Sequence, residues 1–137
     1  MNNSKIIQDG IKIQNSGNVS RFLSLQFIKA EEMTFTYKLI FPEECSNPFG
    51  FVQGGMITAA LDEATSLTVV ITSKNKFIPN STDIHTTYHR PVSTGEAIAI
   101  AKIIKLGQKI VSIEGKLYSK DNKLSASLLH TALLHPK

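Results

Sequence analysis

Cysteine is almost absent from this sequence, in which Cys45 is the single cysteine among 137 residues. One cysteine excludes a framework of internal disulfides and suits a reducing compartment, so we expect a cytoplasmic protein. Cys45 lies beside a polar loop, but the sequence places no histidine or other base next to it that could generate a thiolate. We therefore predict that Cys45 is chemically inert.

Long apolar runs and dense basic stretches are absent as well. The first nine residues lack the continuous apolar segment of a signal peptide, and Thr68 interrupts the apolar residues 67–71 before they approach the length of a membrane span. Lysine and arginine exceed the acidic residues by 15 to 11, but they are scattered along the chain. The sequence thus predicts neither a membrane nor a nucleic-acid partner, and its formal charge of +4 is compatible with an anionic ligand.

Histidines with the spacing of metal ligands are also missing. The nearest pair, His85 and His89, would lie about 13 Å apart along one face of a strand, too far to hold one ion. The sequence has no P-loop, dinucleotide fingerprint or nucleophilic serine motif either. We expect no metal and no bound cofactor.

The remaining composition is that of an ordinary globular protein, with 42% hydrophobic and 19% charged residues. We predict a single domain over residues 1–137, in which residues 1–19 form an N-terminal arm or a short helix.

Alternating apolar residues predict six strands. Leu23, Leu25 and Phe27 alternate with polar residues, and residues 33–41 do the same, which predicts a hairpin with a turn at residues 30–32. Residues 42–53 and 74–80 are interpreted as loops. The other expected strands cover residues 81–90, 97–104, 110–119 and 124–134.

One long helix is predicted from Gly55 to about Ser73. It is apolar almost all round, so we expect a sheet to wrap around it. Its one polar stripe contains Thr58, Asp62, Thr65 and Ser66. Glu63 points about 100° away from Asp62, so the two acids cannot serve one site. Because one helix cannot cover both faces of an antiparallel sheet, we expect a dimer.

The carboxylate of Asp62 is the first candidate for chemistry. A core acid bonded to Ser66 or to the backbone is the structural alternative, and the acid alone favours it. Asp62 could also act as a general base, because burial raises the pKa of a carboxyl group toward the range that such a base needs. The backbone N–H groups of Gly54 and Gly55, at the helix start, could stabilise an oxyanion. With these glycines ahead of Asp62, the two interpretations are evenly balanced.

The loop before the helix holds two amide side chains, those of Asn47 and Gln53. Either could hydrogen-bond a substrate carbonyl or a water molecule. Asn47 followed by Pro48 is also an ordinary start of a turn, and that interpretation is preferred from these residues alone.

Together these motifs resemble a known signature. The pattern Asn47-x-x-Gly50-x-x-Gln53-Gly54-Gly55, followed by Leu61-Asp62, is similar to that of hotdog-fold acyl-CoA thioesterases of the PaaI-like group, within the 4-hydroxybenzoyl-CoA thioesterase superfamily. Tyr88-His89-Arg90-Pro91 and Gly107-Gln108-Lys109 resemble further segments of that family. The resemblance covers about residues 20–134.

The resemblance implies an α+β hotdog fold, in which a six-stranded antiparallel sheet wraps around one central helix. It also implies a homodimer, or a dimer of dimers, that hydrolyses an acyl-CoA at the subunit interface. Asp62 would act as general base or nucleophile, the Gly54 N–H as oxyanion hole, and Asn47 would position the thioester or the water. The substrate-binding positions implied are Gln53, Gly55, Ser66, Ser81, Arg90, Lys105 and Lys109.

Gln53 stands where many members of that family carry histidine, and an amide can donate a hydrogen bond but cannot carry a proton at neutral pH. Two alternatives to hydrolysis stay open. One is a hotdog protein that binds acyl-CoA without turnover, for which a buried acid would be unnecessary. The other is an acyl-thioester dehydratase, which would use a histidine beside the helix, and residues 44–62 contain none.

Overall fold

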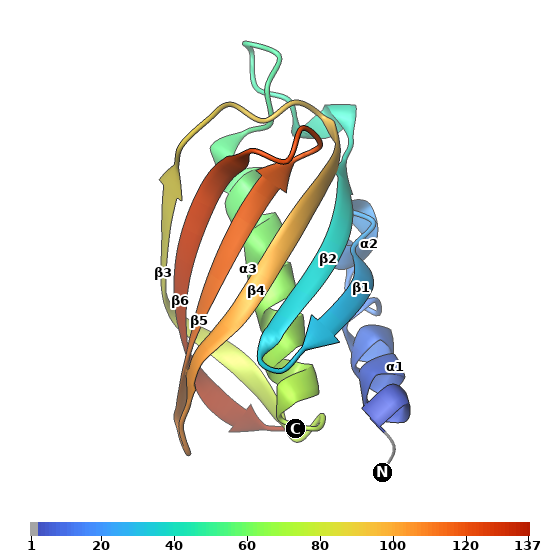
Figure 1. Ribbon diagram of the computed structural model, residues 1–137, viewed down its shortest axis with the longest axis vertical. Coiled ribbons are helices and arrows are strands. Elements are labelled where there is room, and N and C mark those ends of the chain that lie inside the picture. The colour runs from blue at the N-terminus through green and yellow to red at the C-terminus, as the bar shows by residue number, and fades with distance from the viewer. Residues whose placement is uncertain (1–2) are drawn as a thin grey trace.

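Six antiparallel strands wrap around one long helix in the computed structural model, which describes residues 3–137 (Figure 1). The helix is α3 (Gly54–Thr72). The strands are β1 (Gln26–Glu31), β2 (Thr34–Phe41), β3 (Phe77–Tyr88), β4 (Gly95–Leu106), β5 (Ile110–Ser119) and β6 (Leu124–Pro136). They follow the order β1-β2-β4-β5-β6-β3, so β1 and β3 are the two edges. The predicted α+β architecture of a sheet around a central helix is confirmed.

The alternation that predicted the second strand reflects burial against α3. Phe35, Tyr37, Leu39 and Phe41 of β2 are buried, while the residues between them are partly or largely exposed. No helix among residues 3–137 covers the opposite face of the sheet, and apolar side chains remain exposed on it at Ile104, Ile110, Leu129 and Leu133. As expected, one helix leaves half of the sheet uncovered.

Helix α3 starts and ends within one residue of the prediction. The backbone of Gln53 is extended, and its carbonyl accepts hydrogen bonds from the N–H groups of Met56 and Ile57 at 2.9 and 3.2 Å. Within residues 3–137, α3 is the one helix that is long and apolar enough to cross a membrane, judged by length and composition only. The sequence had predicted no segment of that length and apolarity. Most residues of α3 are buried against the sheet and the N-terminal helices, which accounts for their apolarity.

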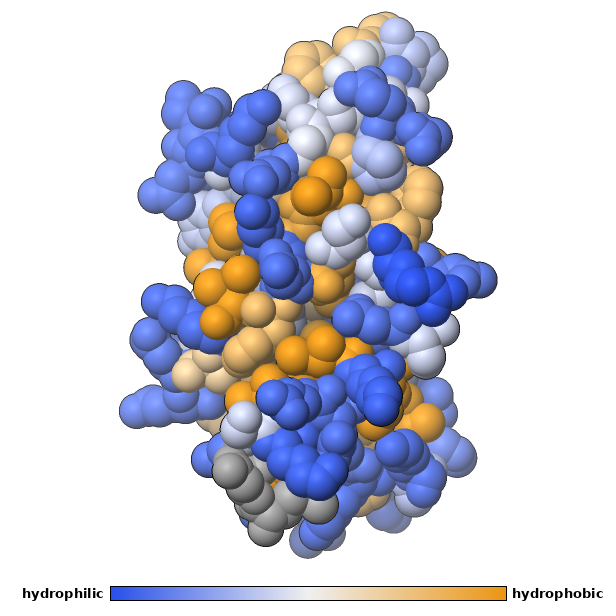
Figure 2. All heavy atoms as spheres, turned by 90° about the vertical axis from the view of Figure 1, so that its right-hand side faces the viewer, coloured by the Kyte–Doolittle hydropathy of each residue, from blue (hydrophilic) through white to orange (hydrophobic). Residues whose placement is uncertain are grey.

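Two N-terminal helices lie beside α3 on the side of β1, namely α1 (Asn3–Gln14) and α2 (Asn18–Phe22) (Figure 1). The expected short helix over residues 1–19 is therefore present as α1, apart from residues 1 and 2, which lie outside the described part. A side chain at Gly10 would place its Cβ 2.6 Å from a carbon of Ile71, so glycine permits the close approach of α1 to α3. Figure 2 views this side, where apolar atoms show between hydrophilic ones.

Two predicted boundaries are wrong. The expected strand around residues 23–27 starts only at Gln26, because α2 occupies residues 18–22 and the N–H of Leu25 bonds back to the carbonyl of Ser20. Leu23 is buried as the end of that helix rather than as part of a strand. The expected loop over residues 74–80 is shorter, because β3 begins at Phe77 and includes Pro79. An edge strand tolerates proline, since one row of its N–H groups has no partner strand.

Tyr37 connects the sheet to α3 through a buried hydrogen bond. Its hydroxyl lies 2.7 Å from Thr68 Oγ1, and the Thr68 hydroxyl donates to the carbonyl of Ala64 at 2.9 Å. Since Thr68 has one hydrogen, it accepts the hydrogen of Tyr37. Burial raises the pKa of Tyr37 well above its usual range, and the bond to Thr68 opposes this only in part.

We expect Tyr37→Phe to lower the free energy of unfolding by about 1 kcal/mol at neutral pH, because one buried hydrogen bond is lost. The pKa of Tyr37 is higher in the folded than in the unfolded state. Its stabilising contribution is therefore complete below about pH 10 and falls by up to about 1.4 kcal/mol per pH unit above it. Urea denaturation at about pH 8 and pH 11 should show the difference between parent and variant shrinking, and a constant difference would contradict this account.

Candidate active site

The loop before α3 is held in place by the side chain of Asn47. Its Oδ1 accepts hydrogen bonds from the N–H groups of Phe49 and Phe51 at 2.9 and 3.1 Å, and its own N–H donates to the carbonyl of Phe51 at 2.6 Å. The carbonyl end of the amide is thus used within the loop, as the turn interpretation expected. The NH₂ end is the part of Asn47 that remains for a ligand.

Gly54 begins α3 directly beneath the ring of Tyr88, which ends β3. The Tyr88 hydroxyl donates to the carbonyl of Gly54 at 2.8 Å and lies 2.7 Å from Thr58 Oγ1. A side chain on Gly54 would place its Cβ 3.2 Å from this ring, whereas a Cβ on Gly55 would meet nothing within 4 Å. The first N–H groups of a helix have no acceptor inside it and carry partial positive charge. The helix start therefore offers donors to an oxyanion or a carbonyl.

A groove of about 510 Å³ joins this helix start to the segment after β3. It brings together three of the predicted site residues, Asn47, Gly54 and Arg90, and it is also lined by Phe49, Phe51 and Tyr88. Phe49 is 82% exposed, which is unusual for a phenylalanine without a partner surface. A second hollow of about 280 Å³ shares Arg90 with the groove and extends to residues 119–125.

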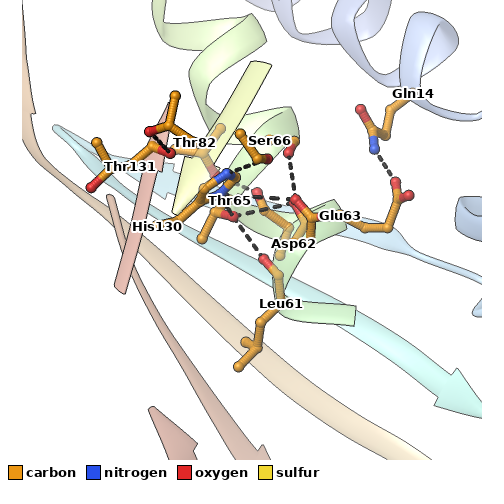
Figure 3. A network of polar contacts seen from close by, with 12 residues as sticks. Gln14, Leu61, Asp62, Glu63, Thr65, Ser66, Thr82, His130 and Thr131 are labelled. Carbon is orange, nitrogen blue, oxygen red and sulfur yellow. Dashed lines mark hydrogen bonds and ion pairs between the residues drawn. The ribbon is translucent and has the colours of Figure 1, made fainter. Parts of the chain in front are cut away.

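Asp62 lies in a separate polar cluster in the middle of α3 (Figure 3). Its Oδ1 accepts a hydrogen bond from Ser66 Oγ at 3.1 Å and lies 3.9 Å from Nδ1 of His130. The side chain is 41% exposed, so one part of the carboxylate faces solvent. Both interpretations of Asp62 therefore describe part of the geometry, since it is bonded to Ser66 and still reachable from outside.

Glu63 points away from this cluster, as its position on the helix predicted. It accepts a hydrogen bond from Gln14 of α1, on the other side of the helix (Figure 3). Burial raises the pKa of Glu63, while the bond to Gln14 opposes that rise and the nearby Asp62 carboxylate adds to it. Glu63 thus belongs to the contact between α1 and α3.

His130 was not predicted as a site residue, because histidines were tested for metal-ligand spacing and for a position near residues 44–62, and His130 meets neither criterion in the sequence. Its ring is buried in β6, with Nδ1 2.9 Å from Thr65 Oγ1 and Nε2 2.7 Å from Ser81 Oγ. The signal was present in the alternation of the last strand, where His130 shares the inward face with apolar residues 126, 128 and 132. A polar group on that face needs a partner, and the polar stripe of the helix supplies one.

The remaining predicted positions are dispersed in this chain. Gln53 is exposed in the loop and makes no side-chain hydrogen bond at the start of α3. Lys105 is the last residue but one of β4 and Lys109 lies in the turn between β4 and β5, which is at the end of the sheet away from the loop before α3 (Figure 1). Cys45 is buried, and burial together with the neighbouring Glu44 raises the pKa of its thiol, which disfavours the thiolate. Among residues 3–137 no group of acidic, histidine or cysteine side chains could hold a metal ion.

The two parts of the site are separated along one helix. Asp62 follows Gly54 by eight residues, which corresponds to about 12 Å of helix rise. A carbonyl bound at the N–H of Gly54 is therefore beyond the reach of Asp62 from the same chain. A reaction that uses both groups needs a second copy.

Comparison with known proteins identifies the family. The sequence matches the family model of the thioesterase superfamily over residues 49–126, more than half of the chain. The chain belongs to the thioesterase superfamily. The matched region includes most of the groove and the whole Asp62 cluster except His130. At the level of the family, the activity is acyl-thioester hydrolysis. A comparison with curated proteins finds no significant match.

Solved structures of thioesterases, and one of a protein with bound acetyl CoA, share the fold. A putative thioesterase from Ralstonia eutropha JMP134, a phenylacetic acid degradation-related protein, is 23% identical with a TM-score of 0.82, covering 90% of this chain and 98% of that one. A thioesterase from Haemophilus influenzae is 24% identical with a TM-score of 0.78, covering 90% and 87%. A Streptococcus mutans protein bound to acetyl CoA is 14% identical with a TM-score of 0.73, covering 82% and 90%. The sheet around α3 is the hotdog fold of these thioesterases.

Proposed function

We propose that this thioesterase superfamily member is a cytoplasmic acyl-CoA thioesterase that converts an acyl-CoA and water into coenzyme A and a carboxylic acid. The observation that carries the proposal is the partly exposed carboxylate of Asp62 on a mostly buried core helix whose N-terminus opens into a groove. Coenzyme A enters as part of the substrate, and the reaction uses no further cofactor.

The chemistry follows from the groups in the two parts of the site. The thioester carbonyl binds at the N–H of Gly54, where the helix start stabilises the negative charge that develops on its oxygen. Asp62 takes a proton from water as the oxygen of that water bonds to the carbonyl carbon. The carbon–sulfur bond then breaks, and the thiolate of coenzyme A leaves and takes up a proton. In the alternative route Asp62 attacks the carbonyl carbon itself, the thiolate of coenzyme A leaves, and water then hydrolyses the acyl-aspartyl anhydride, which releases the carboxylic acid and restores Asp62.

The proposal includes a homodimer in which each site takes Asp62 from one chain and Gly54 from the other. It is supported by the separation of about 12 Å between these residues along α3, which one chain cannot bridge. It is also supported by β3, an edge strand with an unpaired side, which contacts the Asp62 cluster through Ser81 and Gly54 through Tyr88. A symmetric partner that pairs with this strand would complete both sites at once. Further pairing of dimers would use the uncovered face of the sheet.

Arg90 is proposed to bind the phosphates of coenzyme A, because it lies in the same groove as Gly54. The adjoining hollow adds Lys120 and Lys123, and also the carboxylate of Asp121. Lys105 and Lys109 lie at the far end of the chain's own sheet and would reach the ligand only from another copy. The acetyl CoA bound by the Streptococcus mutans relative supports a ligand of this class.

Thiol release from a panel of short, long and aromatic acyl-CoAs tests the reaction class. We expect free thiol in stoichiometric amounts with the carboxylic acid for at least one substrate. Ligand that is retained without free thiol would indicate a binding protein instead. Loss of enoyl absorbance without thiol would indicate a dehydratase.

The structure places a histidine beside α3, the position that a dehydratase of this fold would need. The sequence criterion considered residues 44–62 alone, which contain no histidine. His130 comes to α3 from strand β6 instead. However, the side chain of His130 is fully buried, and both of its ring nitrogens are hydrogen-bonded within the protein. A ring in that environment cannot take a proton from substrate carbon, so hydrolysis remains the preferred function.

We expect Arg90→Gln to raise KM for acyl-CoA roughly tenfold with little change in kcat, because a charge-assisted contact to phosphate is lost. An acyl-pantetheine thioester, which lacks the nucleotide and its phosphates, should be hydrolysed equally by parent and variant. Lys29→Gln, on the opposite edge strand β1, is the control and should behave like the parent. An unchanged KM for acyl-CoA in Arg90→Gln would contradict the proposed role.

A further inference from the structure

His130 is a buried polar residue that packing alone does not require. It lies on the inward face of β6 between Leu128 and Ala132, both of which are buried, and its register partner on β5 is the buried Ile113. Burying an imidazole costs free energy unless both nitrogens are satisfied. Both are satisfied here by hydroxyl groups from other elements, Thr65 on α3 and Ser81 on β3.

The hydrogen-bond network fixes the form of the ring. The Thr65 hydroxyl donates its single hydrogen to the carbonyl of Leu61 at 2.8 Å, in the usual bond of a helical threonine to the preceding turn. Thr65 Oγ1 is therefore an acceptor toward His130, so Nδ1 carries the proton. In the neutral ring, Nε2 is therefore the unprotonated nitrogen and accepts the hydrogen of Ser81. The network thus selects the tautomer whose N–H edge faces α3.

That N–H edge lies next to the carboxylate of Asp62. Nδ1 is 3.9 Å from Asp62 Oδ1, beyond a hydrogen bond but close enough for a strong electrostatic effect in a buried site. Within residues 3–137, Asp62 is the one ionisable group that faces the ring. The neighbours on β3, β5 and β6 are Ser81, Ile84, Ile113, Leu128 and Ala132, and Glu63 points toward α1.

We propose that His130 is a positioning residue for Asp62, a neutral imidazole that Thr65 and Ser81 hold with its N–H edge toward the carboxylate, so that it favours one orientation of Asp62 without adding a positive charge beside it. The inference rests on the proposed hydrolase function and deepens it. A charged imidazolium at this distance would stabilise the carboxylate and make it a weaker base. Burial lowers the pKa of His130 below its usual value of about 6.5, although the charge of Asp62 opposes this, so the ring is neutral at pH 7.

Three substitutions at His130 separate positioning from simple packing. His130→Asn keeps an N–H near Thr65, and His130→Gln keeps a polar group near Ser81, whereas His130→Leu removes both. We expect His130→Asn to retain kcat within a few fold and His130→Leu to lose kcat at least about tenfold with KM unchanged. His130→Gln should fall between them. A His130→Leu variant that is folded, as shown by its circular dichroism and melting temperature, and that keeps the parental kcat would overturn the inference.

The pH profile gives a readout that a packing role would not change. In the parent, kcat should decline on the acidic side of neutrality as His130 gains its charge, at a pH below the usual 6.5 of histidine because burial lowers the pKa of the ring. In His130→Asn the part of the decline that comes from the charge of the ring should be missing, so the acidic limb of its profile should differ from that of the parent. Identical acidic limbs in the two proteins would overturn the inference.

Nitrogen-15 NMR of the imidazole measures the contact without any reaction. We expect the Nδ1–H tautomer in the parent and a further fall of the His130 pKa in Asp62→Asn, because the carboxylate no longer favours the charged ring. An unchanged pKa would overturn the inference. If the parent releases no thiol from any acyl-CoA, the proposed function fails, and the catalytic part of this inference fails with it. If the parent is active and the His130 variants match it, this inference alone fails.

Discussion

Replacing Asp62 with asparagine is expected to lower kcat for thiol release by roughly 100-fold or more, because the general base for water is removed. The variant should fold normally. Asparagine keeps an oxygen that can accept the hydrogen bond from Ser66, and 41% of the side chain is exposed, so the free energy of unfolding should stay within about 1 kcal/mol of the parent. Steady-state thiol release and urea denaturation measure the two effects.

Glu63→Gln is the matched control for Asp62→Asn. It makes the same chemical change one residue further along α3, on the side that contacts Gln14. Glutamine can still bond to Gln14, so we expect near-parental activity and stability. Parental activity in Asp62→Asn, or an equal loss in both variants, would show that Asp62 is not the base.

Gly54→Val should produce the other large loss, on the order of 100-fold in kcat, because it disturbs the donor that stabilises the oxyanion. The Cβ alone would lie 3.2 Å from the ring of Tyr88, and the two γ-methyl groups would displace this ring and cover the N–H. The hydrogen bond from Tyr88 to the carbonyl of Gly54 would be strained as well. Thiol release at saturating substrate measures the effect.

Gly55→Val separates this effect from a general cost of valine in the first helical turn. A Cβ at Gly55 meets nothing within 4 Å, and the residue is exposed. Both variants place the same β-branched residue in the first helical turn, so the intrinsic effect of valine on the helix is matched and their difference reports the local crowding at Tyr88. Equal activities in the two variants would mean that the N–H of Gly54 is not part of the oxyanion hole.

The parts of the fold that could be predicted are those governed by regular local patterns. The alternation in β2 and the uniform apolarity of α3 gave their boundaries closely, because burial on one face or all round leaves a direct periodic signal. The short helix α2 was missed because Leu23 and Leu25 happen to continue the alternation of a strand. The early start of β3 was missed because Pro79 suggests a loop unless the strand is known to lie at an edge.

The candidate site shows a similar division. The choice of Asp62 over Glu63 followed from helix geometry alone, and the structure turns Glu63 toward α1 as expected. The partner His130 could not be assigned in the same way, because it lies 65 residues after Thr65 and meets α3 only when β6 takes its place in the sheet. The alternation of residues in β6 could place His130 on the inward face of the sheet, but it could not show which turn of α3 His130 would contact.

Strand β3 gives the proposed dimer an unusual property. Its Ser81 end contacts the Asp62 cluster and its Tyr88 end contacts Gly54, so antiparallel pairing of two copies of β3 would set the Asp62 cluster of each chain beside the groove of the other. Each of the two sites would then contain residues from both chains, and the two-fold axis of the dimer would relate one site to the other. A chain inactivated at Asp62 and a chain inactivated at Gly54 carry complementary intact halves. When they assemble together, one site of the pair is whole and the other lacks both groups.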